Sequence, residues 1–154
     1  MKQPPKIPSS FYKGEKMKIG EIKIQSLMLI FPSLDFEYDP DNLSEAVSRL
    51  KANGLYTSYI SATVGAINRA LAVIEGEMGY APSKITHLTG DDTILDLKEG
   101  VCELIPYLVK ADLLATEAPS EAQASRKIFY EEIKKHLDTP PYSETVYCQR
   151  SILK

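Results

Sequence analysis

The chain has 154 residues, a formal net charge of -3, 44% hydrophobic residues and 25% charged residues. This length and composition are typical of one globular domain with short tails. The slight negative charge excludes an overall electrostatic attraction to nucleic acid or to an acidic membrane surface.

The cysteine content and the hydropathy narrow the possible class of protein further. Cys102 and Cys148 are too few and too far apart for a disulfide framework or a CxxC metal site, which favours a reduced, intracellular setting. Cys102 lies in an apolar segment and is expected to be a small packed hydrophobe. The longest apolar run, Leu27–Phe31, is far shorter than the roughly 20 residues that span a bilayer. The N-terminus also lacks the apolar core of a signal peptide, so we expect a soluble protein without a membrane partner.

Residues 1–16 are expected to form an extended N-terminal arm. Pro4, Pro5 and Pro8 prevent a regular helix and favour polyproline II. Two interpretations stay open, a disordered terminus and an arm that lies on a neighbouring subunit. In the second, Phe11 and Tyr12 would be the anchors.

Residues 17–138 contain the helical patterns, and we expect a mainly α, compact bundle of about four to five helices. The first helix is expected over Met17–Phe31, because apolar residues recur at helical spacing until Pro32. The clearest helix is expected at about Tyr56–Met78. Its apolar stripe steps by three or four residues and consists of Ile60, Val64, Ile67, Leu71, Ile74 and Met78. Gly65 within it is expected to serve close helix packing, since glycine otherwise weakens a helix.

A short helix is expected between these two, at Leu43–Ala52. Asp41 or Asn42 is expected to cap it through its side chain. Asn53-Gly54 is expected to end it, because both residues tolerate the left-handed conformation. The preceding segment alternates apolar and polar residues, which indicates a brief extended stretch containing Leu34, Phe36 and Tyr38.

The stretch Ile94–Leu137 predicts a helical hairpin. Its first half is apolar nearly all round and is expected to be the buried central helix, with a kink or break at Pro106. After a turn at Glu117-Ala118-Pro119, an amphipathic helix is expected to fold back, with Ser120 and Gln123 forming a capping box. Its expected buried stripe is Ala122, Ser125, Phe129, Ile133 and His136 or Leu137. The connection Gly79–Thr93 is rich in turn residues, and no sheet is expected there.

Residues 139–154 are expected to form an extended C-terminal tail. Tyr142–Lys154 has the aromatic and β-branched residues of a strand but no strand partner in a helical chain. This makes it the best candidate for pairing with another protein. The residues expected to contact a partner are Tyr142, Val146, Tyr147 and Ile152 from the tail and Phe11 and Tyr12 from the arm.

No catalytic or metal-binding constellation stands out in the sequence. His87 and His136 have no Cys, Asp or Glu at ligand spacing. Asp91-Asp92 lacks the pattern of a calcium loop, so turn and capping roles are favoured. Asp112 is expected to pair structurally with a lysine or arginine. We therefore expect a non-enzymatic protein without a metal or a cofactor.

Five segments together resemble a known group of proteins. They are Ile22–Pro32 (IKIQSLMLIFP), Val64–Glu75 (VGAINRALAVIE), Leu104–Leu114 (LIPYLVKADLL), Glu117–Ile133 (EAPSEAQASRKIFYEEI) and Ser143–Tyr147 (SETVY). Over about Ile19 to Tyr147 the chain resembles the head–tail connector, or adaptor, proteins of tailed phages and Gram-positive prophages. It departs from them in lacking a longer, strand-rich insertion at Gly79–Thr93 and in carrying an extension before Met17.

The resemblance implies a helical subunit that forms a ring, expected to be a dodecamer, beneath the portal protein. Such a ring extends the DNA channel, touches double-stranded DNA only non-specifically, and offers a surface to the next neck or tail component. The C-terminal tail would reach the portal. The protein would then belong to the virion neck, after assembly in the host cytoplasm.

Two other functions remain as alternatives. The first is another phage neck or tail-completion role, such as a stopper or terminator. The second is a small helical regulatory protein that binds DNA or another protein. A DNA-binding regulator needs a basic recognition helix, and Arg49 and Arg69 are too sparse for one.

Overall fold

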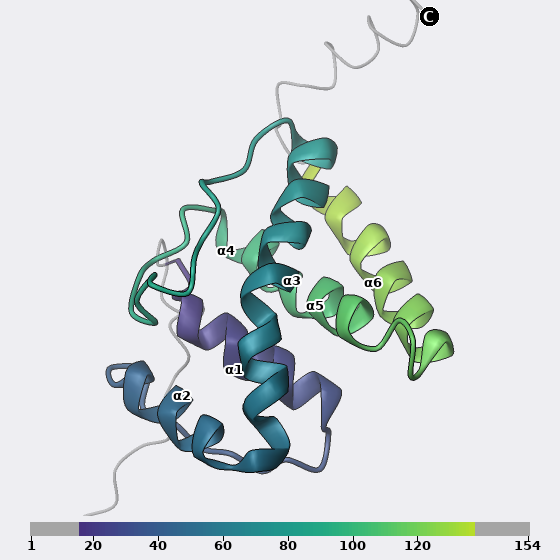
Figure 1. The fold of residues 1–154 in the computed structure, drawn as a ribbon. Helices are drawn as coiled ribbons and strands as arrows, with labels where there is room; N and C mark the ends of the chain where they lie inside the picture. Colours follow the sequence, from purple (N-terminus) through teal and green to yellow (C-terminus); the bar gives the residue numbers. More distant parts are fainter. Residues whose placement is uncertain (1–15, 138–154) are drawn as a thin grey trace, which may run out of the picture.

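The computed structural model describes residues 16–137, and these fold into a bundle of α-helices (Figure 1). In chain order the helices are α1 (Ile19–Ile30), α2 (Leu43–Ala52), α3 (Gly54–Met78), α4 (Glu99–Cys102), α5 (Ile105–Leu113) and α6 (Pro119–Leu137). Helix α4 is a single turn. Within residues 16–137 the only β pairing is an isolated antiparallel bridge between Lys18 and Ile94. The expectation of a mainly α bundle is confirmed.

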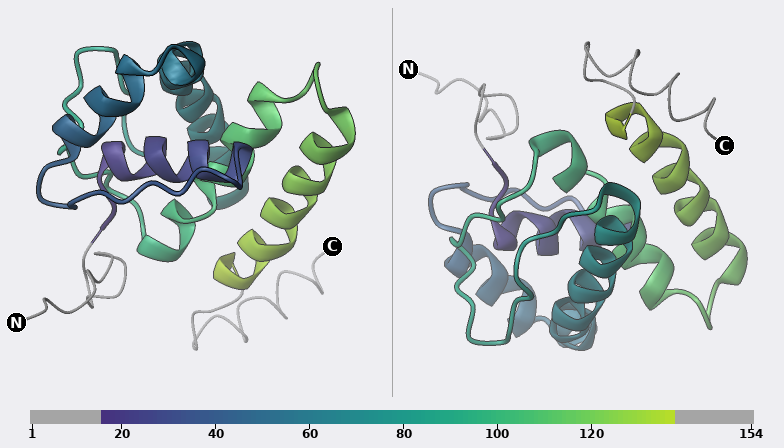
Figure 2. Two further views of the ribbon diagram at one scale, coloured as in Figure 1. Left: turned by 90° about the horizontal axis from the view of Figure 1, so that it is seen from below. Right: turned by 90° about the horizontal axis from the view of Figure 1, so that it is seen from above.

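Helix α1 is the most enclosed element of the bundle. It packs against α2, α3 and α5, and the views from below and above show it running through the middle of the fold (Figure 2). Nine of its twelve residues are buried, including the polar Glu21, Lys23 and Ser26. Ser26 donates its hydroxyl proton to the Ile22 carbonyl oxygen at 2.7 Å. The core is therefore centred on α1 together with α5, whereas the sequence pattern indicated the stretch after Ile94 alone.

The N-terminus of α1 is capped by the loop that precedes α4. The first N–H groups of a helix have no partner inside the helix. Here the Ile19 N–H donates to the Thr93 carbonyl at 2.9 Å, and the Gly20 N–H donates to the Asp91 carbonyl at 2.8 Å. The Leu95 N–H in turn donates to the Met17 carbonyl at 2.9 Å. The loop is thereby held on α1 by backbone hydrogen bonds.

Gly20 is a point of close approach between α1, this loop and α2. A Cβ atom at Gly20 would lie 3.0 Å from the Asp91 carbonyl oxygen, 3.0 Å from the Asp91 Cβ and 3.0 Å from the Leu43 Cβ. These atoms of Asp91 and Leu43 belong to the backbone or are Cβ atoms, so a side-chain rotation cannot move them away. Glycine is therefore required at this position by packing.

Overpacking costs about 1–3 kcal/mol, and the roughly 1 kcal/mol that alanine gains over glycine in a helix offsets part of this cost. We therefore expect Gly20→Ala to destabilise the protein by up to about 2 kcal/mol. Urea unfolding followed by circular dichroism measures it. Gly76→Ala in α3 is the matched control, because its Cβ would meet nothing within 4 Å. An unchanged or raised stability of the Gly20 variant would contradict the close approach.

The residues at the boundary between α2 and α3 act differently from the prediction. Helix α2 has the predicted bounds, but the Asn42 side chain makes no capping hydrogen bond. Asn53 has φ -85°, so it does not adopt the left-handed conformation. Its side chain instead accepts a hydrogen bond from the Leu55 N–H at 2.9 Å and caps α3. Helix α3 consequently begins at Gly54, two residues before the predicted Tyr56.

The predicted apolar face of α3 is confirmed. Its buried residues include Ile60, Val64, Ile67, Leu71 and Ile74. The packing role predicted for Gly65 is wrong, because a Cβ there would meet only the Arg69 guanidinium, at 3.4 Å or more. The helix ends at Gly79, whose φ of 78° is the left-handed conformation that glycine adopts at low cost.

The predicted central helix is divided into α4 and α5. Pro106 stands in the first turn of α5, where the missing N–H costs nothing. The break at this proline is as expected, but residues 94–98 are not helical. Cys102 is fully buried, and burial raises the pKa of its thiol to about 12. The prediction that Cys102 is a small packed hydrophobe is confirmed.

Helix α6 folds back against α5, as the hairpin pattern predicted (Figure 1). Ala122, Ser125, Phe129 and Ile133 are its buried residues. The predicted capping box is wrong in register. The helix begins at Pro119, which places Ser120 inside its first turn.

Candidate functional site

The six residues that the sequence singled out for partner binding are Phe11, Tyr12, Tyr142, Val146, Tyr147 and Ile152. All of them lie outside the described residues 16–137. What the structure does describe is the part of the core from which the two terminal segments leave. We call this part the arm junction and define it by Lys16, Met17, Leu95–Gly100 and His136.

The N-terminal side of the arm junction is held by main-chain and side-chain bonds. Met17 is 1% exposed, and its carbonyl accepts the Leu95 N–H. Lys16 forms an ion pair with Asp96, and the Tyr80 hydroxyl donates to the Asp96 carbonyl at 2.9 Å. The hydrogen bond with Asp96 raises the pKa of Lys16, and the hydrogen bond and charge of Lys16 lower the pKa of Asp96. The chain is therefore anchored to the core from Lys16 onward.

The C-terminal side rests on α4. A Cβ atom added at Gly100 would lie 2.4 Å from His136 Cε1, so the imidazole ring of the last turn of α6 covers this glycine. Burial lowers the pKa of His136, and the nearby charge of Lys98 lowers it further. These effects favour the neutral form of the ring, which lies against Gly100 of α4.

Both ends of the described chain thus meet one short segment. In Figure 2 the turn α4 lies between the start of α1 and the end of α6, from below and from above. Leu95 and Asp96 hold the first end and Gly100 holds the second. The two ends of the described chain therefore lie on either side of α4.

A partly buried ion pair fixes the loop next to the arm junction. Lys23 Nζ lies 2.9 Å from Asp91 Oδ1, and the two side chains are only 8% and 18% exposed. The sequence suggested a turn role for Asp91, and its carbonyl does cap α1. Its carboxylate, however, has the further role of neutralising a lysine inside the core.

Asn68 fixes the other part of the same loop. Its Nδ2 donates to the Ile85 carbonyl at 2.8 Å, and its Oδ1 accepts the Ile85 N–H at 2.8 Å. Ile85 is 7% exposed, so water does not replace these bonds. Sequence reasoning missed both Asn68 and Lys23. The available signal was a polar residue inside an apolar run, between Ile22 and Ile24 for the lysine and next to Ile67 for the asparagine.

The ion pair predicted for Asp112 is confirmed. Arg69 Nε lies 3.1 Å from each carboxylate oxygen of Asp112, which joins α3 to α5. The hydrogen bond with Asp112 raises the pKa of Arg69. Because the arginine side chain is 63% exposed, this pair contributes at most about 1 kcal/mol.

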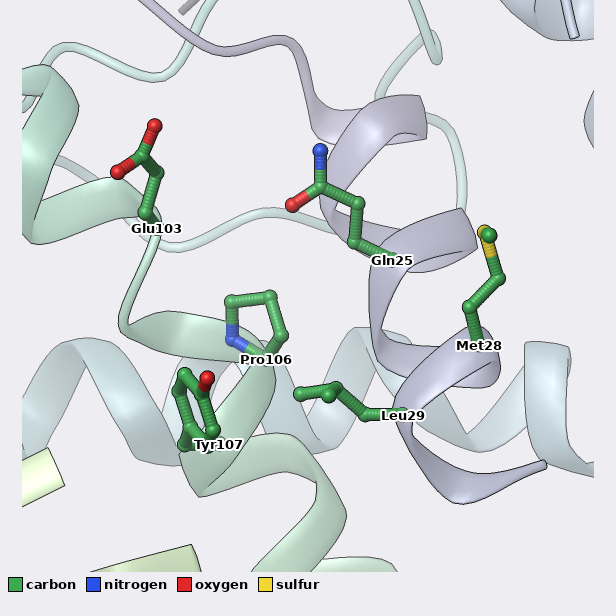
Figure 3. Close-up of a pocket in the computed structure, with 6 residues that line it drawn as sticks. All are labelled: Gln25, Met28, Leu29, Glu103, Pro106 and Tyr107. Carbon is green, nitrogen blue, oxygen red and sulfur yellow. The ribbon is translucent and has the colours of Figure 1, made fainter. Parts of the chain in front are cut away.

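A shallow groove of about 270 Å³ opens between α1 and the α4–α5 segment (Figure 3). It is lined by Gln25, Met28 and Leu29 of α1 and by Glu103, Pro106 and Tyr107. In Figure 3 Gln25 and Glu103 stand at one end of the groove. Met28, Leu29, Pro106 and Tyr107 form its apolar part. This groove lies on the one face of α1 that other helices do not cover completely.

Residues 16–137 contain no cluster of three or more His, Cys, Asp and Glu side chains that could hold a metal ion. Within the same residues no helix has both the length and the hydropathy to cross a membrane. The chain matches no known protein family, no curated protein and no solved structure.

Proposed function

We propose that the protein is a structural subunit of the head–tail connector of a tailed phage or prophage. In this role copies of the chain form a ring between the portal protein and the next neck or tail component, and the ring lines the DNA channel. The motivation is the resemblance of five sequence segments to connector proteins. The structural observation that supports it best is the arm junction.

The arm junction suits a subunit that works by assembly. A ring subunit needs a core that keeps its shape and peripheral segments that reach its neighbours. Here Met17 and His136, close to the two ends of the described core, flank the short helix α4 from either side. A partner placed over this region is within reach of the arm and the tail together.

The core also has the internal bonds that a rigid subunit requires. The loop between α3 and α4 is fixed to α1 by backbone hydrogen bonds and by the Lys23–Asp91 pair, and to α3 by Asn68. The outer face of α6 carries exposed charges of both signs, among them Glu121, Lys127, Glu131 and Lys134. A mixed polar surface of this kind suits a channel or rim that contacts DNA only non-specifically.

Deletion of Pro141–Lys154 is expected to leave the fold intact and to abolish portal binding. The deleted segment contains Tyr142, Val146, Tyr147 and Ile152, the proposed contacts, and the described core ends before it. A pull-down with the portal protein encoded in the same genome measures binding, and circular dichroism checks helix content. Leu88→Ser in the full chain is the matched control. It removes a 94% exposed apolar side chain from the loop between α3 and α4 without touching the tail.

The outcomes separate the candidate functions. Portal binding that survives the deletion rejects the tail as the docking element. If the full-length chain does not bind the portal protein but binds the tail-side component, the result indicates a stopper or terminator. Negative-stain electron microscopy of the purified chain tests for closed rings. A shift of DNA in a gel that weakens with salt, without rings or portal binding, indicates a regulatory protein instead.

A further inference from the structure

We propose that the groove between α1 and the α4–α5 segment is the docking site of this chain's own N-terminal arm, with Phe11 and Tyr12 as the inserted side chains. This inference does not rest on the connector function, and it assigns Phe11 and Tyr12 to their own chain instead of to a neighbouring subunit or the portal. The groove presents Met28 and Leu29 of the otherwise enclosed helix α1, together with Pro106 and Tyr107 of α5. The arm ends beside the groove, and its length and charge fit it.

The place where the arm ends is the first argument. The Met17 backbone hydrogen-bonds to the Cys102 thiol and pairs with Leu95. Glu103, the next residue after Cys102, stands at one end of the groove (Figure 3). Residues 1–15 therefore leave the core next to the opening of the groove.

The length of the arm is the second argument. Gln25, at one end of the groove, lies six residues along α1 from Ile19, which is about 9 Å at 1.5 Å per residue. The arm starts at Lys16, three residues before Ile19, and the stretch from Lys16 back to Phe11 spans about 17 Å when extended. Phe11 and Tyr12 are therefore within reach of this end of the groove in their own chain.

Chemistry is the third argument. The groove combines one aromatic ring, one proline and two flexible apolar side chains with a single charged residue, Glu103. Proline-rich segments favour such aromatic-lined grooves because they lose little conformational entropy on binding. Residues 1–15 contain three lysines against one glutamate, so their net positive charge complements Glu103 of the groove. Residues 138–154 contain two acidic and two basic residues and lack this complementarity.

The methionine methyl groups provide a test in the full-length chain. Its four methionines are Met1, Met17, Met28 and Met78, so a carbon-13 methyl-methionine NMR spectrum has few signals. Met28 lines the groove, whereas Met78 lies at the end of α3 against the core. Aromatic rings shift nearby methyl signals strongly. The double variant Phe11→Ser and Tyr12→Ser is therefore expected to shift the Met28 signal and to leave Met78 unchanged, at every protein concentration.

The matched control replaces the same residue type at the other terminus, as Tyr142→Ser and Tyr147→Ser, and is expected to leave Met28 unchanged. A Met28 signal that does not respond to the arm variant overturns the proposal. So does a response that disappears on dilution, because the occupant is then the arm of a second copy. A response to the tail variant alone overturns it in favour of the C-terminal segment.

Discussion

Replacement of Asp91 by alanine is expected to lower the free energy of unfolding by about 3 kcal/mol. The substitution leaves the Lys23 ammonium group, whose side chain is 8% exposed, without its counter-charge. Breaking a buried pair from one side costs about 3–5 kcal/mol, and the lower end applies because the Asp91 side chain is 18% exposed. Chemical denaturation followed by circular dichroism measures the loss.

The neighbouring residue supplies the control for this prediction. Asp92 is exposed, and Asp92→Ala is expected to change stability by less than about 0.5 kcal/mol. The double variant Lys23→Met and Asp91→Ala removes both charges, so it is expected to be more stable than Asp91→Ala alone. Equal stabilities of the single and double variants would show that the lysine does not need the carboxylate.

Replacement of Asn68 by alanine is expected to cost about 2–4 kcal/mol. The side chain holds both the N–H and the carbonyl of Ile85, each at 2.8 Å, and Ile85 is buried. An unsatisfied buried polar group costs about 1–3 kcal/mol, and this variant leaves two. Asn68→Asp keeps the size but replaces the donor to the Ile85 carbonyl by a carboxylate oxygen, so it is expected to be destabilising as well.

Hydrogen exchange gives this second prediction a local readout. The Ile85 amide is expected to be protected in the unaltered chain and to lose protection in Asn68→Ala. Ser61→Ala, an exposed position on the same helix, is the control and is expected to preserve both stability and protection. Full Ile85 protection in the asparagine variant would mean that the loop is held by other contacts.

Local sequence patterns predicted the helices well. The bounds of α2 and the apolar stripe of α3 follow from spacing, because the side chains of one helical face recur every three or four residues. The break near Pro106 follows from the missing proline N–H. The ends of the helices were harder to predict. Asn53 serves as the N-cap of α3 rather than as a left-handed stop, and both roles have the same residue preference.

The identity of the most enclosed helix was not predictable in the same way. The segment of α1 contains Glu21, Lys23 and Gln25 in alternation with apolar residues, and this local pattern does not indicate that Glu21 and Lys23 are buried. In the fold Glu21 accepts the Lys18 N–H at 3.1 Å, and Lys23 pairs with Asp91. Burial of these polar groups depends on partners that no local pattern reveals.

By itself the sequence determined a mainly helical bundle, the positions of most helices and a packed Cys102. These properties depend on side-chain periodicity and on neighbours within a few residues. Only the tertiary structure decided that α1 is enclosed, that Gly20 touches the loop and α2, and that α4 lies between the two chain ends. The physical reason is that the deciding bonds join residues far apart in the chain. Lys23 with Asp91 and Asn68 with Ile85 become neighbours only when the whole core has packed.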